Sequence, residues 1–108
     1  VVKQKGIEHL RILLPEQQIA CCRIVEEAFM NALKHAQASL LSMIVTKQPF
    51  SLTVIIKDNG RGFDTSLSKK NHYGIKNMVY RAHHMGAELV LNASPHAGTT
   101  ISLDIPTH

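Results

Sequence analysis

Residues 16–37 read EQQIACCRIVEEAFMNALKHAQ and contain neither glycine nor proline. Apolar residues recur along this stretch with helical spacing, and Glu16 stands where a carboxylate favours the positive end of a helix dipole. The stretch therefore predicts the longest helix of the chain. At about 100° per residue, its apolar stripe, which we expect to face a sheet, consists of Cys22, Val25, Phe29, Ala32, Leu33 and Ala36.

Three polar residues of this predicted helix, Glu27, Asn31 and Lys34, fall nearly opposite the apolar stripe. Exposure to water is the ordinary explanation for polar residues on such a helix, and for Lys34 alone it is the better one. Asn31 is less ordinary, because asparagine is a mediocre helix former. Glu27 and Asn31 are four residues apart and share one helix face. Together they suit a metal-bound phosphate, since Mg²⁺ needs few protein oxygens where phosphates and water supply the rest.

The remaining chain alternates between strand patterns, turns and one more helical pattern. Glycine and proline mark the connections, and Gly86 stands where a left-handed residue would close the second helix. The order of elements favours helices on one face of a mixed sheet, a two-layer α/β sandwich. The expected elements are strands at Gly6–Leu14, Ser39–Lys47, Leu52–Ile56, Glu88–Ala93 and Thr99–Ile105, a loop at Asp58–Asn71 and a helix at Gly74–Met85.

The sequence DNGRGF at Asp58–Phe63 follows an apolar strand directly. A carboxylate fixed at a strand end can accept a hydrogen bond from an exocyclic amine such as that of adenine, and Gly60 and Gly62 permit close approach of the main chain. An Asp-Asn-Gly hairpin turn explains the same residues equally well. Gly74 likewise predicts either a phosphate-binding helix N-terminus or a plain helix start.

Composition narrows the classes of function. The chain has 108 residues, 44% of them hydrophobic, which suits one domain, and no apolar run approaches the roughly 18 to 20 residues that span a bilayer. A net charge of +4 is compatible with polyanions, but two Tyr and three Phe offer little base stacking, which disfavours nucleic acid. The absence of an initial methionine suggests a piece of a longer chain.

Cys21 and Cys22 are adjacent in the predicted helix, where a disulfide between neighbours would be strained. We therefore expect both thiols to be reduced, as in a cytoplasm. A zinc site that combines them with His83 and His84 lacks the usual paired ligand spacing.

Four motifs, taken together, resemble those of a known family. Glu27–Ala36 (EAFMNALKHA) resembles the N box of the GHKL ATPases and histidine kinases, and Asp58–Phe63 resembles their G1 box. His72–Met78 (HYGIKNM) resembles the G2 region, and Gly98-Thr99 the final G-T element. The motifs follow the family's order over roughly residues 15–106. The chain is thus similar to the ATP-binding catalytic domain of a bacterial sensor histidine kinase, in the nitrate-sensor and lipid-sensor group.

The resemblance implies a Bergerat fold and a site for ATP and Mg²⁺. It implies that Asp58 binds the adenine amino group, that Asn31 holds Mg²⁺, and that Glu27 polarises the attacking group or assists the metal. Either Lys34 or His35 would contact phosphate, and residues 65–72 would form a short lid. The other ATP-binding positions implied are Gly60, Gly62, Tyr73, Gly74, Ile75 and Thr99.

The resemblance also implies partners that the chain does not contain. Residues 1–108 would be the whole catalytic domain, without the N-terminal dimerisation domain that carries the phosphoacceptor histidine. A response regulator would receive the phosphoryl group, the parent would be a homodimer, and the domain would be cytoplasmic whether or not the parent has a membrane anchor. Tested alone, the chain should bind ATP without autophosphorylation. The alternatives are another GHKL ATPase, such as an anti-sigma factor serine kinase, and a degenerate docking module without catalysis.

Overall fold

The computed structural model describes residues 2–34, 38–60, 69–93 and 98–107, with the backbone alone described at 34, 69–75 and 93. Within these ranges, no helix combines the length and the apolar character that crossing a bilayer requires. Cys21 and Cys22 are both free thiols, as their adjacency in the sequence predicts.

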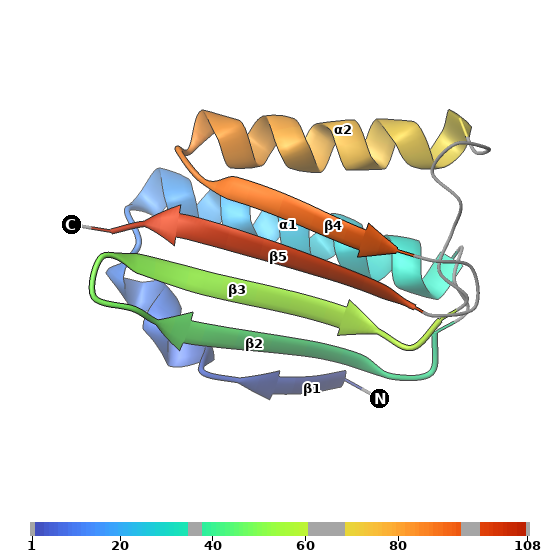
Figure 1. Cartoon of the computed structure of the whole chain (residues 1–108), viewed down its shortest axis with the longest axis horizontal. Coiled ribbons are helices and arrows are strands. Elements are labelled where there is room, and N and C mark those ends of the chain that lie inside the picture. Colours follow the sequence, from blue (N-terminus) through green and yellow to red (C-terminus); the bar gives the residue numbers. More distant parts are fainter. Residues whose placement is uncertain (1, 35–37, 61–68, 94–97, 108) are drawn as a thin grey trace.

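Five strands form one mixed sheet, and two α-helices lie on the same side of it (Figure 1). The sheet order is β1-β2-β3-β5-β4, in which β1 runs parallel to β2 and every other neighbouring pair is antiparallel. The predicted two-layer α/β sandwich is therefore correct. The elements are β1 (Val2–Lys5), a 3₁₀ helix η1 (Ile7–Ile12), α1 (Pro15–Lys34), β2 (Leu41–Lys47), β3 (Ser51–Asp58), α2 (Lys69–His84), β4 (Glu88–Ala93) and β5 (Thr99–Pro106).

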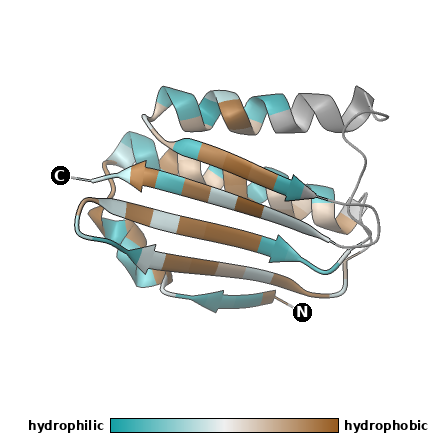
Figure 2. Cartoon of the chain, viewed as in Figure 1, coloured by the Kyte–Doolittle hydropathy of each residue, from teal (hydrophilic) through white to brown (hydrophobic). Residues whose placement is uncertain are grey.

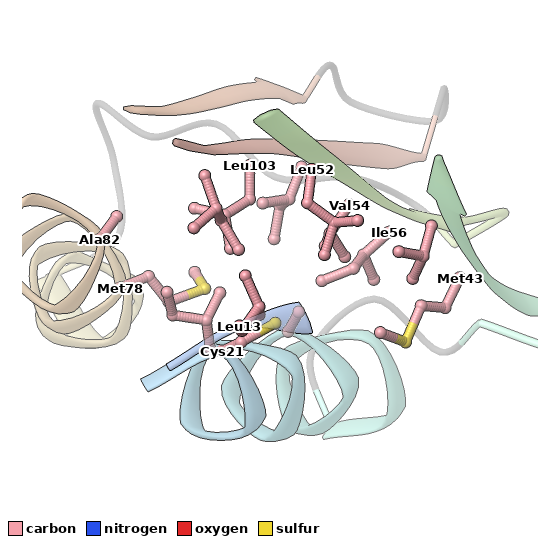
Figure 3. Close-up of a cluster of buried hydrophobic side chains, with 14 residues drawn as sticks. Leu13, Cys21, Met43, Leu52, Val54, Ile56, Met78, Ala82 and Leu103 are labelled. Atoms are coloured by element: carbon pink, nitrogen blue, oxygen red, sulfur yellow. The ribbon is translucent and has the colours of Figure 1, made fainter. Parts of the chain in front are cut away.

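The hydrophobic core fills the space between the sheet and the two helices (Figure 3). Alternate residues of β2, β3 and β5 point inward, because successive side chains of a strand face opposite sides. Figure 2 shows apolar residues running along these central strands. Fully buried members of the core include Ile24, Leu52, Val54, Met78, Leu103 and Ile105.

The buried stripe of α1 differs from the predicted one. Cys21, Ile24, Ala28 and Ala32 are buried, whereas Cys22 and Leu33 are exposed. Of the predicted stripe, Ala32 is buried, Val25 and Phe29 are half-buried at its edge, and Ala36 lies outside the described residues. The prediction was rotated by about one residue, roughly 100°. Apolar residues occur on several sides of this helix, so spacing alone does not select the stripe that faces the sheet.

The prediction of a strand at Gly6–Leu14 was wrong. The strand is β1, which ends at Lys5, and Gly6 then turns the chain with a φ of 78° into η1. A side chain at Gly6 would collide with the carbonyl oxygen of Val45, so the turn requires glycine. The alternation of apolar residues at positions 10, 12 and 14 was misleading, since Leu13 is the buried residue here and Ile12 and Leu14 are exposed.

Helix α2 starts earlier than predicted and ends as predicted. It begins at Lys69, so Gly74 lies inside the helix and not at its N-terminus, and residues 69–72 of the expected lid are helical. Residues 65–68 of that lid lie outside the described residues. Gly86 has a φ of 77° and donates its N–H to the carbonyl of His83 at 3.0 Å, which is a left-handed helix ending.

Candidate functional site

A small pocket lies where the C-terminal half of α1 covers one end of the sheet. Its polar lining comes from Asn31 of α1, Asp58 at the end of β3 and Thr99 at the start of β5. The sheet register pairs Asp58 with Leu41 on one side and with Thr99 on the other, so this end of the sheet is aligned across three strands. The apolar lining consists of Ala28, Ala32, Leu41, Ile56, Met78, Leu91 and Ile101.

The pocket brings together a helix-borne amide and a strand-end carboxylate, as the sequence led us to expect of Asn31 and Asp58. The two residues are 27 positions apart in the sequence. Because α1 packs on the sheet, both of them line the same pocket. The cavity volume is about 10 Å³, which is about the space that one water molecule needs. In this conformation the pocket is therefore closed to anything as large as a purine.

The Asp58 carboxylate is oriented by its own turn. Its Oδ1 accepts a hydrogen bond from the Gly60 N–H at 2.8 Å, and Gly60 is buried. Among the described residues, the second carboxylate oxygen has no hydrogen-bond partner, although Asp58 is only partly exposed. One oxygen therefore fixes the side chain, and the other can accept a hydrogen bond from a ligand.

The Gly98-Thr99 pair closes the pocket from β5. Thr99 is buried, and its Oγ1 has no hydrogen-bond partner among the described residues, which is costly for a buried hydroxyl unless something binds it. Gly98 has a φ of 78°, and a Cβ there would collide with the carbonyl oxygen of Asp58. Glycine at this position thus allows β5 to start directly beside the Asp58 backbone.

Asn59 is a polar residue of this region that the sequence prediction did not single out. Its Oδ1 accepts hydrogen bonds from the N–H groups of Ser39 at 3.0 Å and Leu40 at 2.9 Å, and its Nδ2 donates to the Ser39 hydroxyl at 2.9 Å. Its backbone N–H also donates to the Leu40 carbonyl at 3.2 Å. In the sequence, an asparagine before glycine indicates only a turn, and nothing in the motif indicates its partners 19 and 20 residues away.

Glu27 does not line the same pocket as Asn31. It lies half-buried in an adjacent groove of about 140 Å³ between α1 and α2, with Met78 forming part of both walls. The four-residue spacing does place Glu27 one turn from Asn31, but the two side chains line different depressions of the structure. The other residues of that groove are Arg23, Glu26, Met30, Asn77 and Arg81.

The remaining predicted site residues are only partly described. Gly74 lies five residues into α2, which is a correction of its predicted place at a helix start. Tyr73 and Ile75 belong to the same helix, but their side chains lie outside the described residues, as does that of Lys34. His35 and Gly62 lie entirely outside them.

The donor and acceptor set of the pocket fits a nucleotide with Mg²⁺, although the present cavity is too small for one. Within the described part of the chain, the hydroxyl of Thr99 and the second oxygen of Asp58 have no hydrogen-bond partner, so a ligand could bind both. Asn31 offers the oxygen ligand that Mg²⁺ prefers. Met78 lines this pocket, and methionine is a flexible side chain that can adopt other rotamers.

Comparison with known proteins places the chain in a family. Residues 16–108 match the family described as histidine kinase-, DNA gyrase B-, and HSP90-like ATPase. The chain is 40% identical over 89 residues to the signal transduction histidine-protein kinase/phosphatase DegS of Brevibacillus brevis, covering 82% of this chain and 23% of that one. It is 35% identical over 65 residues to the nitrate/nitrite sensor protein NarX of Escherichia coli K12, covering 60% and 11%.

A solved structure gives the same fold. The histidine kinase domain of the blue-light activated histidine kinase from Erythrobacter litoralis superposes with a TM-score of 0.78 at 24% identity, covering 98% of this chain and 50% of that one. The chain spans about a quarter of the length of the DegS relative, so it corresponds to one part of such a protein. With the match over residues 16–108 and the relatives above, the chain belongs to the histidine kinase-, DNA gyrase B- and HSP90-like ATPase family, and its relatives there are sensor histidine kinases.

Proposed function

We propose that this chain binds Mg-ATP in the pocket between α1 and the sheet and supplies the γ-phosphate for phosphorylation of a histidine. The observation that carries the proposal is that Asn31 and Asp58 line one pocket together with the buried Thr99, whose hydroxyl has no hydrogen-bond partner in the ranges that the structure describes. Membership of the ATPase family supports the same ligand.

Each polar group of the pocket has a distinct role in this proposal. The second carboxylate oxygen of Asp58 accepts a hydrogen bond from the exocyclic amine of adenine, and Thr99 donates its hydroxyl hydrogen nearby. Asn31 holds Mg²⁺ through its amide oxygen, and the metal neutralises phosphate charge. Phosphoryl transfer requires mainly positioning and charge neutralisation, which this set can provide.

The proposal also gives roles to Glu27 and to predicted site residues that are not described or are described only in part. Glu27, across Met78 in the adjacent groove, polarises the attacking group or assists the metal once the pocket opens. Lys34 or His35 contacts phosphate, and Gly62, Tyr73, Gly74 and Ile75 surround the nucleotide. Because Gly74 lies within α2, its backbone N–H reaches a phosphate only if the first turns of that helix rearrange.

The acceptor of the phosphoryl group lies in a longer parent protein in this proposal. The sensor kinase relatives are about four times longer than the stretch that matches. We propose a dimerisation domain with the acceptor histidine, a homodimeric parent, a response regulator as the next acceptor and a cytoplasmic location for this domain. The 108-residue chain tested alone then binds nucleotide without phosphorylating itself.

Isothermal titration with Mg-ADP tests the site. Asp58→Asn replaces an acceptor oxygen by an amide that cannot serve both Gly60 and a ligand amine, so we expect roughly 30-fold weaker binding, about 2 kcal/mol. Asp104→Asn is the matched control, because it removes the same charge from an exposed residue on the outer face of β5. It should change the Kd less than twofold. Absence of binding to the unmodified chain, or equal binding by the Asp58 variant, contradicts the proposal.

A further inference from the structure

Asn59 ties the turn that carries Asp58 to the chain segment that follows α1. Three hydrogen bonds of its side chain go to Ser39 and Leu40, and its backbone N–H adds a bond to the Leu40 carbonyl. From this geometry we propose that Asn59 is a positioning residue, which sets the orientation of the Asp58 carboxylate and thereby the base selectivity of the site. The inference rests on the function proposed above.

The two segments that Asn59 joins carry the two halves of the pocket. Asn31 lies one turn before the end of α1, and Ser39 and Leu40 lead from that helix into β2. Asp58 ends β3 and is the direct neighbour of Asn59. The Asn59 side chain accepts hydrogen bonds from two backbone N–H groups at once. It therefore fixes the turn after Asp58 relative to the segment that follows α1.

The orientation of Asp58 depends on this turn. Its Oδ1 is held by the N–H of Gly60, so a rotation of the backbone between residues 58 and 60 would also rotate the carboxylate. Asn59 is the residue between them, and its bonds to Ser39 and Leu40 oppose such a rotation. Without them, the carboxylate of Asp58, a residue that lines the pocket, would no longer be held in one orientation.

Because Asn59 is exposed, its effect on the orientation of Asp58 can be distinguished from its effect on the stability of the fold. Its side-chain hydrogen bonds are exposed to solvent, where water competes for the same groups and the net contribution to folding is small. The site, in contrast, depends on the direction of one carboxylate oxygen, and small misplacements of a recognition group weaken binding strongly. Loss of Asn59 should therefore affect ligand discrimination more than the stability of the fold.

The experiment compares two nucleotides that differ at the group Asp58 would bind. Mg-ADP carries the exocyclic amine, and Mg-inosine diphosphate carries a carbonyl oxygen in its place. We expect the unmodified chain to bind ADP at least about tenfold more tightly than inosine diphosphate. In Asn59→Ala this preference should fall to within about threefold, because the acceptor is no longer aimed at the amine.

Two further variants separate positioning from a merely structural role. Asn59→Asp keeps an oxygen for the N–H groups of Ser39 and Leu40 and should retain most of the preference for ADP. Thr53→Ala removes another exposed side-chain hydrogen bond, to Asp104 on the outer sheet face, and should leave the preference unchanged. Should Asn59→Ala be unfolded by circular dichroism, Asn59→Ser, whose shorter side chain cannot span both N–H groups, replaces it.

The outcomes are distinct. A lower preference for ADP in the alanine or serine variant, restored by aspartate, supports the positioning role. Weakening of both nucleotides by the same factor, an unchanged preference, or an unmodified chain that does not distinguish the two nucleotides overturns the inference while ADP binding stands. An unmodified chain that binds neither nucleotide overturns the proposed function itself.

Discussion

Gly98 lies against the backbone of Asp58 at the start of β5. Its φ of 78° is unfavourable for any residue with a Cβ, and the added Cβ would also meet the Asp58 carbonyl oxygen. Because both effects act together, we expect Gly98→Ala to lower the free energy of unfolding by about 3 kcal/mol or more. Urea denaturation measures this change.

Gly86 provides the control for Gly98. It has nearly the same φ, 77°, but a Cβ there would have no neighbour within 4 Å among the residues that the structure describes. Gly86→Ala should therefore cost only the backbone term, about 1 kcal/mol. Equal losses in the two variants would contradict the close approach of Gly98 to the Asp58 carbonyl oxygen.

The sequence singled out Asp58 after an apolar strand and Asn31 within a helix because each side chain has a chemistry of its own. Both residues line one pocket, and their roles in binding stay predictions. Asn59 and Met78 were not given a role, because their importance comes from partners distant in the sequence. Glu27 lines the neighbouring groove between α1 and α2, so its action at the same point as Asn31 stays a prediction.

At the scale of elements, the rotation of α1 about its axis decides which residues carry the core. Ile24 is 0% exposed and Ile19 is 63% exposed, although both are isoleucines of the same helix. Ile24→Ala should lower the free energy of unfolding by about 3 kcal/mol, because it leaves a cavity beneath the sheet. Ile19→Ala should change it by less than about 0.5 kcal/mol. Thermal and urea unfolding of the pair test this register, and similar losses at both positions would contradict it.

The elements themselves were largely predictable, and their exact limits were not. Both helices and four of the five strands follow from periodicity, as does the left-handed Gly86 that ends the second helix. The first strand was predicted too late in the sequence, because apolar residues in and after η1 alternate as they would in a strand. The need for glycine at the Gly6 turn comes from the carbonyl of Val45, which is far along the chain. The rotation of α1 could not be predicted, since it depends on the sheet that it covers.

At the scale of the whole molecule, a titratable group in the core makes the free energy of unfolding depend on pH. Cys21 is buried where α1 meets the sheet (Figure 3). Burial, and secondarily the adjacent Cys22, raises the pKa of the Cys21 thiol from 9.0 to about 11. In the unfolded chain the thiol ionises near its ordinary value, so between these two values the folded state binds more protons than the unfolded state.

This difference predicts how the stability of the molecule changes in alkaline solution. The contribution of Cys21 is fully present below pH 9 and is lost as pH rises to about 11, because the unfolded state releases its proton first. The full loss is about 2 to 3 kcal/mol, a large part of the stability of a domain of this size. The comparison must be between variants, so that contributions common to both cancel. Cys21→Ala should flatten the decline in the free energy of unfolding between pH 9 and 11, measured by urea denaturation. Cys22→Ala, which alters the exposed neighbour, should retain most of it, and equal pH profiles for the two variants would show that the Cys21 thiol does not control alkaline unfolding.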